Sequence, residues 1–223
     1  DLMEETKKRK QFEQYFSNND LIYIKEVLLK SLLKNEKYHS KAGLTHNLKL
    51  ETWMDTTIDN TSNDTREGER IEIQTARLSM IKLMIELSNI TNDSKKAKEY
   101  TQIEQEFAKK VKDIFFCEKN KEKDQEENKN KENKEQKEEL QQQEFILKDG
   151  KNDATIRPNI FLAYYLYPEL LSLQEWEKVF DTALKQLWVD WGGLTTIDKT
   201  SKYFTWEYTG EDNKSYHRGD SWF

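Results

Sequence analysis

Apolar side chains recur every three or four residues in several long stretches of this chain, which is the pattern of amphipathic helices. The first predicted helix covers residues 21–35, with Asp20 as a candidate N-cap. Its apolar stripe is broad, because extra positions widen the basic spacing: Leu21, Ile24, Val27, Leu28, Leu29 and Leu32. We therefore expect this helix to be buried on more than one side.

Further helices are predicted along the chain. Residues 71–90 are apolar nearly all round, as in a helix buried in a larger assembly, whereas residues 94–116 carry one apolar stripe opposite lysines and acids. Residues 159–167 form a short helix that the following proline stops. The last helix has a well-marked start, because Ser172 and Glu175 have the spacing of a capping box.

Two long loops interrupt the helical pattern. Residues 39–70 are rich in Asn, Thr and Asp and are too long to be a mere connector. Residues 192–223 begin with two glycines and continue with Thr, Tyr, Trp and Phe, which is typical of extended loops. Helix pairs joined by such loops indicate an all-α toroid of hairpins with a site at one rim, although a plain helical bundle fits the same pattern.

Composition changes abruptly between Glu118 and Glu144. This segment consists almost entirely of Glu, Lys, Asn and Gln, and Leu140 is its only apolar residue. It cannot bury enough apolar area to offset its ordering entropy, so we expect it to be disordered or a solvated single helix. The chain then divides into a first helical part at 1–117, a low-complexity charged insertion at 118–144, and a second helical part with aromatic loops at 145–223.

Composition and charge exclude several classes of protein. No stretch approaches the roughly 20 apolar residues of a membrane span, and the acidic start lacks the apolar core of a signal peptide, so we expect a cytoplasmic protein without membrane contact. The single cysteine, Cys117, excludes an internal disulfide and a multi-cysteine zinc site, and we expect it to be a packing residue. The formal net charge of −6 gives nucleic-acid binding no support.

Aromatic side chains are concentrated near the C-terminus, where five of the six tryptophans fall between Trp176 and Trp222. We expect Trp176 and Trp188, which lie on a predicted helix, to be buried. Trp191, Trp206 and Trp222 instead lie in predicted loops beside Asp, Glu, Arg and His. Aromatic faces mixed with carboxylates suit sugar rings, whose C–H faces stack while their hydroxyl groups need polar partners.

Two acids have neighbours that bear on their chemistry. Asp55 follows Trp53 and Met54 in the first long loop, and a carboxyl desolvated by an aromatic ring can stay protonated near neutral pH and act as a general acid. The alternative is that Asp55 caps a turn. Asp220 lies close to His217 in the sequence, but these two side chains are too few for a metal site.

Five stretches, taken in order, resemble one known family. They are ETWMDTT at 51–57, REGERIEIQTARLSMIKLM at 66–84, DATIRPNIFLAYYL at 153–166, GGLTTIDKTSKYF at 192–204 and YHRGDSW at 216–222. In this order and spacing they are similar to the C-terminal, amylo-α-1,6-glucosidase domain of the glycogen debranching enzyme family. The resemblance covers roughly residues 40–223 and skips the charged segment.

The resemblance implies a six-hairpin (α/α) toroid, of which this chain forms a part, with long loops at the site rim. It also implies a glycoside hydrolase that removes α-1,6-linked glucose from glycogen or a related α-glucan. Inversion at the anomeric carbon, without a cofactor, is implied as well. Because the predicted helices are too few for that toroid, we expect a missing remainder of the same polypeptide to complete it.

The resemblance further implies roles for individual residues. Asp55 matches the catalytic proton donor, and Trp53 is the expected sugar platform in the same loop. Arg66 and Glu72 match polar residues at the site rim. The full set of substrate-binding residues implied in this way is Trp53, Arg66, Glu72, Arg157, Asn159, Tyr216, His217, Arg218 and Trp222.

The second catalytic acid is a point of departure from the family. Eukaryotic members read Gly-Pro-Glu-Trp here, with the Glu as general base, whereas this chain reads Gly-Asp-Ser-Trp at 219–222. We expect Asp220 to take the role of the base from a slightly shifted backbone. The alternative is that the base lies beyond Phe223.

Two other functions remain open at this point. The first is a glucoamylase-like or trehalase-like α-glucosidase on the same fold, which would cut a different linkage. The second is a non-catalytic helical or glucan-binding fragment, because its toroid is truncated. An incomplete toroid also exposes apolar helix faces, which favour aggregation or association with a partner.

Overall fold

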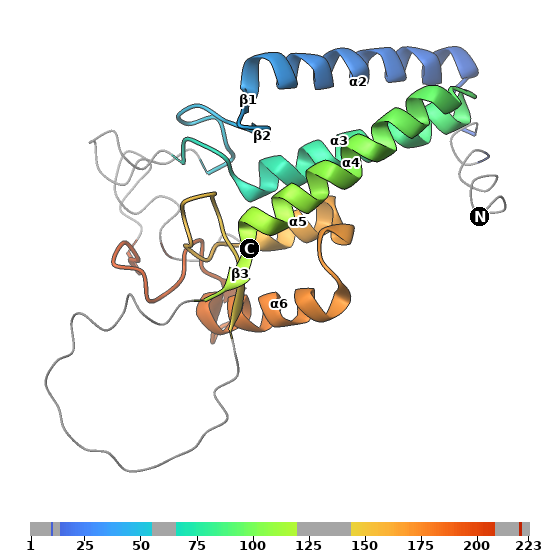
Figure 1. The fold of residues 1–223 in the computed structure, drawn as a ribbon. Helices are drawn as coiled ribbons and strands as arrows, with labels where there is room; N and C mark the ends of the chain where they lie inside the picture. The colour runs from blue at the N-terminus through green and yellow to red at the C-terminus, as the bar shows by residue number, and fades with distance from the viewer. Residues whose placement is uncertain (1–9, 11–13, 55–65, 120–143, 208–218, 220–223) are drawn as a thin grey trace, which may run out of the picture.

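The computed structural model describes residues 10, 14–54, 66–119, 144–207 and 219. Within these ranges the chain is mostly helical, and short strands pair into two-stranded antiparallel sheets (Figure 1). The helices are α2 (Asn18–His39), α3 (Ile71–Ile90), α4 (Ser94–Phe115), α5 (Asn159–Leu166) and α6 (Leu173–Leu187), with the 3-10 turn η2 (Pro168–Leu170). The strands are β1 (Ser40–Lys41), β2 (Leu44–Thr45), β3 (Phe116–Glu118), β4 (Phe145–Leu147), β5 (Trp188–Val189) and β6 (Gly193–Leu194).

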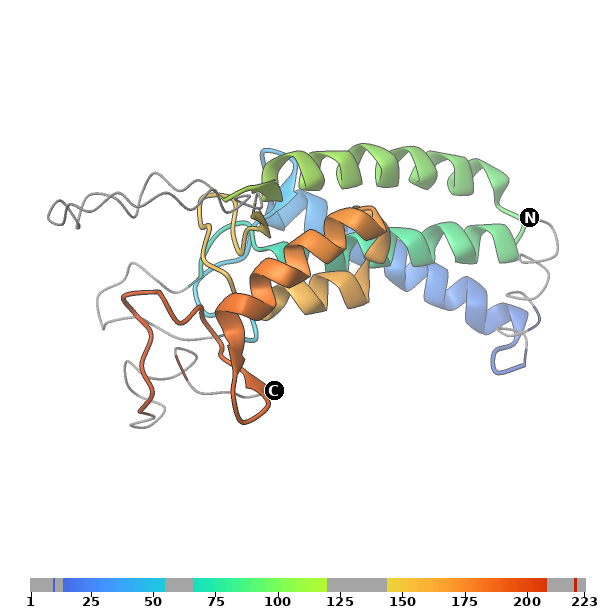
Figure 2. The ribbon, with the colours of Figure 1, turned by 90° about the horizontal axis from the view of Figure 1, so that it is seen from below.

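Helix α3 lies at the centre of the described helices. It contacts α2, α4 and α5, and Figures 1 and 2 show α2 on one side of the α3–α4 pair and α5 and α6 on the other. The predicted helix 71–90 has the bounds of α3, and its burial on several sides is confirmed. Its buried apolar side chains are Ile71, Leu78, Ile81, Met84, Leu87 and Ile90.

Among the described residues, helix α2 is covered on one side only, so the prediction of burial on more than one side is wrong there. Leu21, Leu28 and Leu32 are buried toward the core. Large side chains elsewhere on the helix are exposed, namely Ile22, Tyr23, Val27, Leu33 and Tyr38. The helix also begins earlier than predicted: Ser17 is the N-cap, and Asp20 completes its capping box from the third helical position.

Helix α6 begins as predicted, at the capping box of Ser172 and Glu175. Trp176 is buried, as predicted, and its ring stacks on that of Phe180 with centroids 5.4 Å apart. The prediction for Trp188 is wrong, because half of this residue is exposed. The helix ends one residue before Trp188, which therefore belongs to β5 in a two-stranded sheet and not to the buried face of α6.

The two ends of the predicted charged insertion lie side by side. Glu118 of β3 is opposite Phe145 of β4, and the backbone N–H of Lys119 donates to the carbonyl of Glu144 at 2.8 Å. A segment of any length can leave and return here without displacing the helices before and after it. Residues 120–143 are outside the described ranges, so the nature of the segment and the three-part division remain predictions.

Cys117 lies in β3, partly buried against the core. Burial raises the pKa of its thiol above the ordinary value, against the opposing effect of Lys148. A raised pKa leaves little thiolate near neutral pH, which favours the interpretation of Cys117 as a packing residue.

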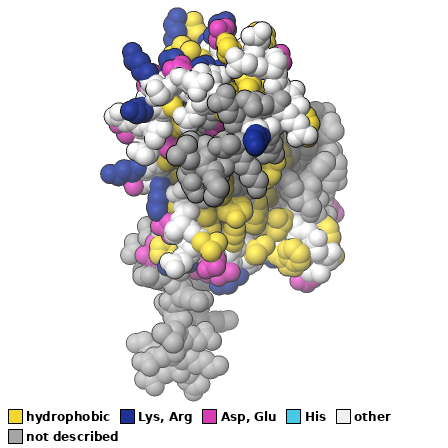
Figure 3. All heavy atoms as spheres, turned by 90° about the vertical axis from the view of Figure 1, so that its right-hand side faces the viewer, with side chains coloured by type: hydrophobic (Ala, Val, Ile, Leu, Met, Phe, Trp, Pro, Cys, Tyr) yellow, Lys and Arg dark blue, Asp and Glu magenta, His cyan; other side chains and the backbone are white. Residues whose placement is uncertain are grey.

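One end of the helices gathers the loops. The C-terminal ends of α2, α4 and α6 and the N-terminal end of α3 all lie at that end of the molecule (Figures 1 and 2). Figure 3 shows the opposite end, where hydrophobic side chains gather on the surface. The all-α prediction is confirmed in its coarser form, because the described chain is mostly helical, but its short two-stranded sheets were not predicted. The described helices are also too few to form a ring of six hairpins. The toroid itself therefore remains a prediction.

Candidate active site

Asp149 follows β4 in the loop that leads to α5 and is 1% exposed. Its Oδ1 accepts from Arg66 Nη2 at 2.9 Å and from Asn159 Nδ2 at 2.6 Å. Its Oδ2 accepts from Arg66 Nε at 3.0 Å and from Arg70 Nη1 at 3.2 Å. Both carboxylate oxygens are therefore occupied by donors from the chain itself.

Arg66 connects this carboxylate to two further residues. Its Nη1 and Nη2 donate to the two carboxylate oxygens of Glu72 at 2.8 and 3.2 Å, and its Nη1 also donates to Thr52 Oγ1 at 2.9 Å. The backbone of Arg66 has a φ of 51°, a left-handed conformation that costs free energy for a residue other than glycine. The Asn47 side chain donates to the Arg66 carbonyl at 2.7 Å, so main chain and side chain are both held.

The loop before α5 brings further charged residues close to Asp149. Gly150 and Asp153 exchange two backbone hydrogen bonds, which close residues 150–153 into a tight turn directly after Asp149. Arg70 Nη1 then pairs with Asp153 Oδ2 at 2.7 Å. Arg157 stands before Pro158, a position that disfavours helix, and its Nε lies 3.7 Å from Asp149 Oδ2.

Opposite charges balance in this cluster, which we call the Asp149 cluster. Its cationic members are Arg66, Arg70 and Arg157, its acidic members are Glu72, Asp149 and Asp153, and Asn159 adds a neutral amide. A buried charge is tolerated only when it is paired and hydrogen-bonded, as the members are here. With all six groups ionised, the three positive charges equal the three negative charges.

Burial and partners pull the pKa values of the cluster in different directions. Burial favours the neutral form of Asp149, but Arg66, Arg157 and Arg70 outweigh it and lower its pKa below the ordinary value of 3.8. Burial also opposes the charge on Arg66, yet Asp149 and Glu72 raise its pKa. For Glu72, burial is the largest effect and raises the pKa despite the facing guanidinium of Arg66.

The segment Thr52–Trp53–Met54 ends against this cluster. Trp53 Nε1 donates to Asn159 Oδ1 at 2.9 Å, and 39% of Trp53 remains exposed. Met54 is fully buried, with its Sδ 3.6 Å from Asn159 Nδ2 and 3.9 Å from Arg157 Nη1. The residue that follows Met54 is Asp55, the predicted general acid.

The structure thus brings five of the predicted site residues together: Trp53, Arg66, Glu72, Arg157 and Asn159. Arg66 and Glu72 are 1% and 4% exposed, so they lie inside the cluster and not at an open rim, and the predicted rim position is corrected. Their charges draw them to Asp149 and to each other. Asp55, Tyr216, His217, Arg218, Asp220 and Trp222 lie outside the described residues, and their roles remain predictions.

Gly219, the residue before Asp220, is described and is held closely. Its carbonyl accepts from the backbone N–H of Thr196 at 3.2 Å, and it forms a bridge with Thr205. A Cβ at this position would meet the Thr205 carbonyl oxygen at 1.6 Å, so a residue with a side chain does not fit. The chain is therefore anchored immediately before the second candidate acid.

Asp149, Arg70 and Asp153 are members that the sequence did not single out. Asp149 stands in an Asp-Gly pair within a polar loop, which is an ordinary turn signal. Nothing in that local pattern distinguishes a buried carboxylate from an exposed one. Only the arrival of Arg66 from a distant part of the chain identifies it.

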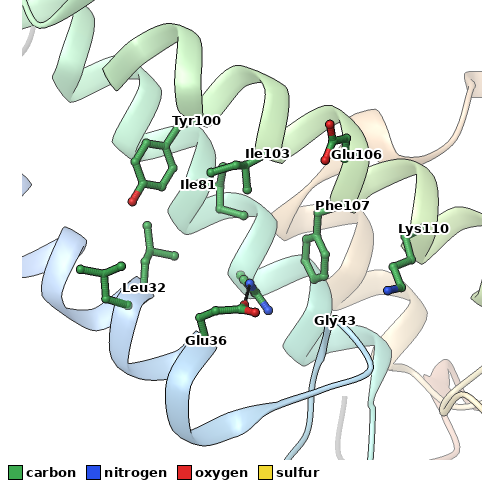
Figure 4. A pocket seen from close by; sticks show the side chains of 11 residues that line it. Leu32, Glu36, Gly43, Ile81, Tyr100, Ile103, Glu106, Phe107 and Lys110 are labelled. Atoms are coloured by element: carbon green, nitrogen blue, oxygen red, sulfur yellow. Dashed lines mark hydrogen bonds and ion pairs between the residues drawn. The ribbon is translucent and has the colours of Figure 1, made fainter. Parts of the chain in front are cut away.

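A separate hollow of about 390 Å³ lies between α2 and α4 over α3 (Figure 4). Its walls are mainly apolar and include Leu32, Leu33, Ile81, Tyr100, Ile103 and Phe107, with an ion pair of Glu36 and Arg77 at its edge. It shares no residue with the Asp149 cluster. Among the described residues, no group of three or more His, Cys, Asp or Glu side chains is placed to hold a metal ion.

These observations define a mostly helical protein whose loops gather tryptophans and charged residues at one end. The sequence model of the amylo-α-1,6-glucosidase family matches residues 4–223, and the chain belongs to this family. No curated protein and no solved structure matches the chain. In the part of the chain that the structure describes, no helix is both long and apolar enough to cross a membrane.

Proposed function

We propose that this chain removes α-1,6-linked glucose from glycogen or a related α-glucan by an inverting mechanism. Asp55 is the general acid and Asp220 is the general base. Membership of the amylo-α-1,6-glucosidase family supports the substrate class.

One observation carries the pairing of the two acids: Arg157 is connected to the residue before each of them, to Met54 directly and to Gly219 through Thr196. Its Nη1 lies 3.9 Å from Met54 Sδ, next to Asp55, and donates to the Thr196 carbonyl at 3.2 Å. Thr196 in turn donates to the carbonyl of Gly219, next to Asp220. Met54 and Gly219, which directly precede the two acids and are far apart in the sequence, are therefore held by one network of contacts around Arg157.

The chemistry requires the two carboxyl groups to have different protonation states. Protonated Asp55 donates its proton to the glycosidic oxygen as the bond to the anomeric carbon breaks. Ionised Asp220 accepts a proton from a water molecule that attacks the opposite face of the sugar. Inverting enzymes hold such groups about 6.5–9.5 Å apart, which leaves room for the water. Trp53 offers a partly exposed ring on which the sugar can stack.

The direct test is the release of glucose from a glycogen limit dextrin by Asp55→Asn and Asp220→Asn variants. General acid and base catalysis contributes typically 10²–10⁴-fold, so each variant should lose about that factor in kcat. Asp190→Asn is the control, because Asp190 is an exposed acid next to Trp191 that has no part in the proposed mechanism. Unchanged activity in either active-site variant would remove that acid from the mechanism.

Two measurements separate the alternatives within sugar chemistry. NMR of the first product formed should show β-glucose, the inverted anomer, whereas α-glucose would exclude the proposed mechanism. Maltose and trehalose, offered in place of the limit dextrin, test the glucoamylase-like and trehalase-like alternatives. Faster hydrolysis of either one would replace the α-1,6 assignment.

Exposed tryptophans favour glucan binding as a second candidate function. Trp188 in β5 is 50% exposed, and Trp191 and Trp206 on the loops that follow are 63% and 59% exposed. Retardation of the chain in a gel that contains glycogen would measure binding without catalysis. A Trp191→Ala variant should be retarded less, and binding without any glucose release would support this function in place of hydrolysis.

A further inference from the structure

We propose that Asp149 is a positioning residue for the loop segment Thr52–Trp53–Met54. It acts through Arg66 and Asn159 and does not touch the substrate. The contacts concern described residues alone, whereas the link to catalysis rests on the proposed function, in which Asp55 follows this segment.

Each of the three consecutive residues has its own contact with the cluster. Thr52 Oγ1 accepts from Arg66, the Trp53 indole donates to Asn159, and Met54 Sδ lies against Asn159 and Arg157. The segment is neither helix nor strand, so no regular backbone pattern orders it. Within the segment the Thr52 hydroxyl donates to the Met54 carbonyl at 3.3 Å, and side chains from other parts of the chain supply the contacts given above.

Asp149 also decides which way the Asn159 amide faces. An ionised carboxylate can only accept, so the NH₂ group of Asn159 must point at it. The carbonyl oxygen of the same amide then faces the opposite side, where the Trp53 indole can only donate. A reversed amide would lose both hydrogen bonds at once.

Asp149 has no capacity left for a substrate. Arg66, Arg70 and Asn159 occupy its two oxygens, and its pKa is lowered by the surrounding guanidinium groups. A carboxylate that is both buried and fully occupied is poorly suited to proton transfer. Its effect on the reaction is therefore indirect, through the orientation of Trp53 and the start of the loop that carries Asp55.

The test measures the surroundings of Trp53 and needs no enzymatic activity. Acrylamide quenching is recorded for each protein and for its Trp53→Phe counterpart, and the difference isolates Trp53 from the five other tryptophans. In Asp149→Asn, Trp53 emission should shift to the red and its quenching should increase. Asp153→Asn is the matched control, because Asp153 also pairs with Arg70 but contacts neither Arg66 nor Asn159. Quenching of Trp53 in this control should stay close to that of the parent chain.

Asn159→Ala is the second variant, for the case that Asp149→Asn does not melt cooperatively. It keeps the pairing of the arginines with Asp149 while it removes the amide that holds Trp53. Increased quenching in Asn159→Ala, without a change in Asp153→Asn, supports the proposal. Equal Trp53 signals in the parent chain and in the folded variants overturn it, whatever the melting temperatures.

Kinetics distinguish a failure of this inference from a failure of the proposed function. A misplacement of about 1 Å can cost 10²-fold in rate, so Asn159→Ala should lower kcat by about that factor with a smaller change in KM. If the parent chain does not hydrolyse limit dextrin, the proposed function fails while the Trp53 result still decides the positioning role. If the parent chain hydrolyses it but Trp53 is unaffected in the variants, only the positioning role fails.

Discussion

The loop end of the protein and the hollow between α2 and α4 are stabilised in opposite ways. At the loop end, charged side chains are buried and each meets specific partners, as in the contacts of Asp149. In the hollow, apolar side chains such as Leu33 and Ile103 remain partly open to solvent, and the Glu36–Arg77 pair lies at the edge. Buried charge requires one geometry, whereas apolar contact tolerates many, so changes at the loop end should have the larger effects.

The largest difference is expected between two arginine-to-alanine variants. Arg66→Ala leaves Asp149 and Glu72 buried without their main cation, and breaking a buried ion pair in this way costs about 3–5 kcal/mol of unfolding free energy. Arg77→Ala removes a partly exposed ion pair and a cation–π contact with Phe107, each worth about 1 kcal/mol or less. Urea denaturation of both variants measures the difference. Equal losses of unfolding free energy in the two variants would show that the loop end and the hollow do not differ in how they are stabilised.

A single added methyl group at the loop end is the next prediction. Gly219→Ala places a Cβ against the Thr205 carbonyl oxygen, so the backbone must shift, at a cost of about 1–3 kcal/mol. Because Asp220 follows directly, glucose release should fall together with the melting temperature. Unchanged melting temperature and activity would mean that this anchor does not hold the chain.

Acid should weaken the loop end through Asp149. Its pKa is lowered in the folded state, so between that pKa and the ordinary value of 3.8 the unfolded state binds more protons. The contribution of ionised Asp149 to the free energy of unfolding is therefore complete above pH 3.8. It is lost as the pH falls through the pKa of Asp149 in the folded state. The pKa of Glu72 is raised in the folded state, so Glu72 lowers the free energy of unfolding as the pH rises above its ordinary pKa of 4.5. That range lies outside the interval below pH 3.8.

Urea denaturation between pH 5 and pH 2 measures this dependence, with Asp149→Asn as the reference. Other lowered carboxyl groups, such as Glu175, contribute equally to both proteins and cancel in the difference. The stability gap between parent and variant should narrow as the pH falls. A gap that stays constant below pH 3.8 would contradict the assignment of this acid sensitivity to Asp149.

The smallest effect is expected in the hollow. Leu33 is 59% exposed, so Leu33→Ser removes little buried area and should change the unfolding free energy by no more than about 0.5 kcal/mol. Leu32→Ser is its matched control one position earlier, because Leu32 is 6% exposed and faces the core. The control should lose clearly more stability in a thermal or urea melt. Similar losses would show that Leu33 is covered in solution.

Local patterns predicted much of the helical structure correctly. Residues 71–90 have the bounds of α3, and α4 and α5 end one residue earlier than predicted. The capping box at Ser172 located the start of α6. Such features depend on residues within one or two turns of each other, so they can be read without knowledge of the rest of the fold.

The predictions that were wrong concern contacts between distant residues. The broad apolar stripe of α2 predicted cover on several sides, but α3 covers only one of them in the described structure. Trp188 follows the helical spacing of α6 but leaves the helix at its end. A periodic pattern tells which side chains share a face, whereas the number of neighbours on that face is a property of the assembled fold.

The sequence by itself determined the helices, the family motifs and the candidate acids of this protein. Only the tertiary structure decided that Arg66 and Glu72 are buried, and that Asp149 joins them to Asn159 and Trp53. The physical reason is the range of the interactions. Helix formation is governed by neighbours along the chain, whereas a charge becomes stable in the interior only when its partners arrive from elsewhere in the fold.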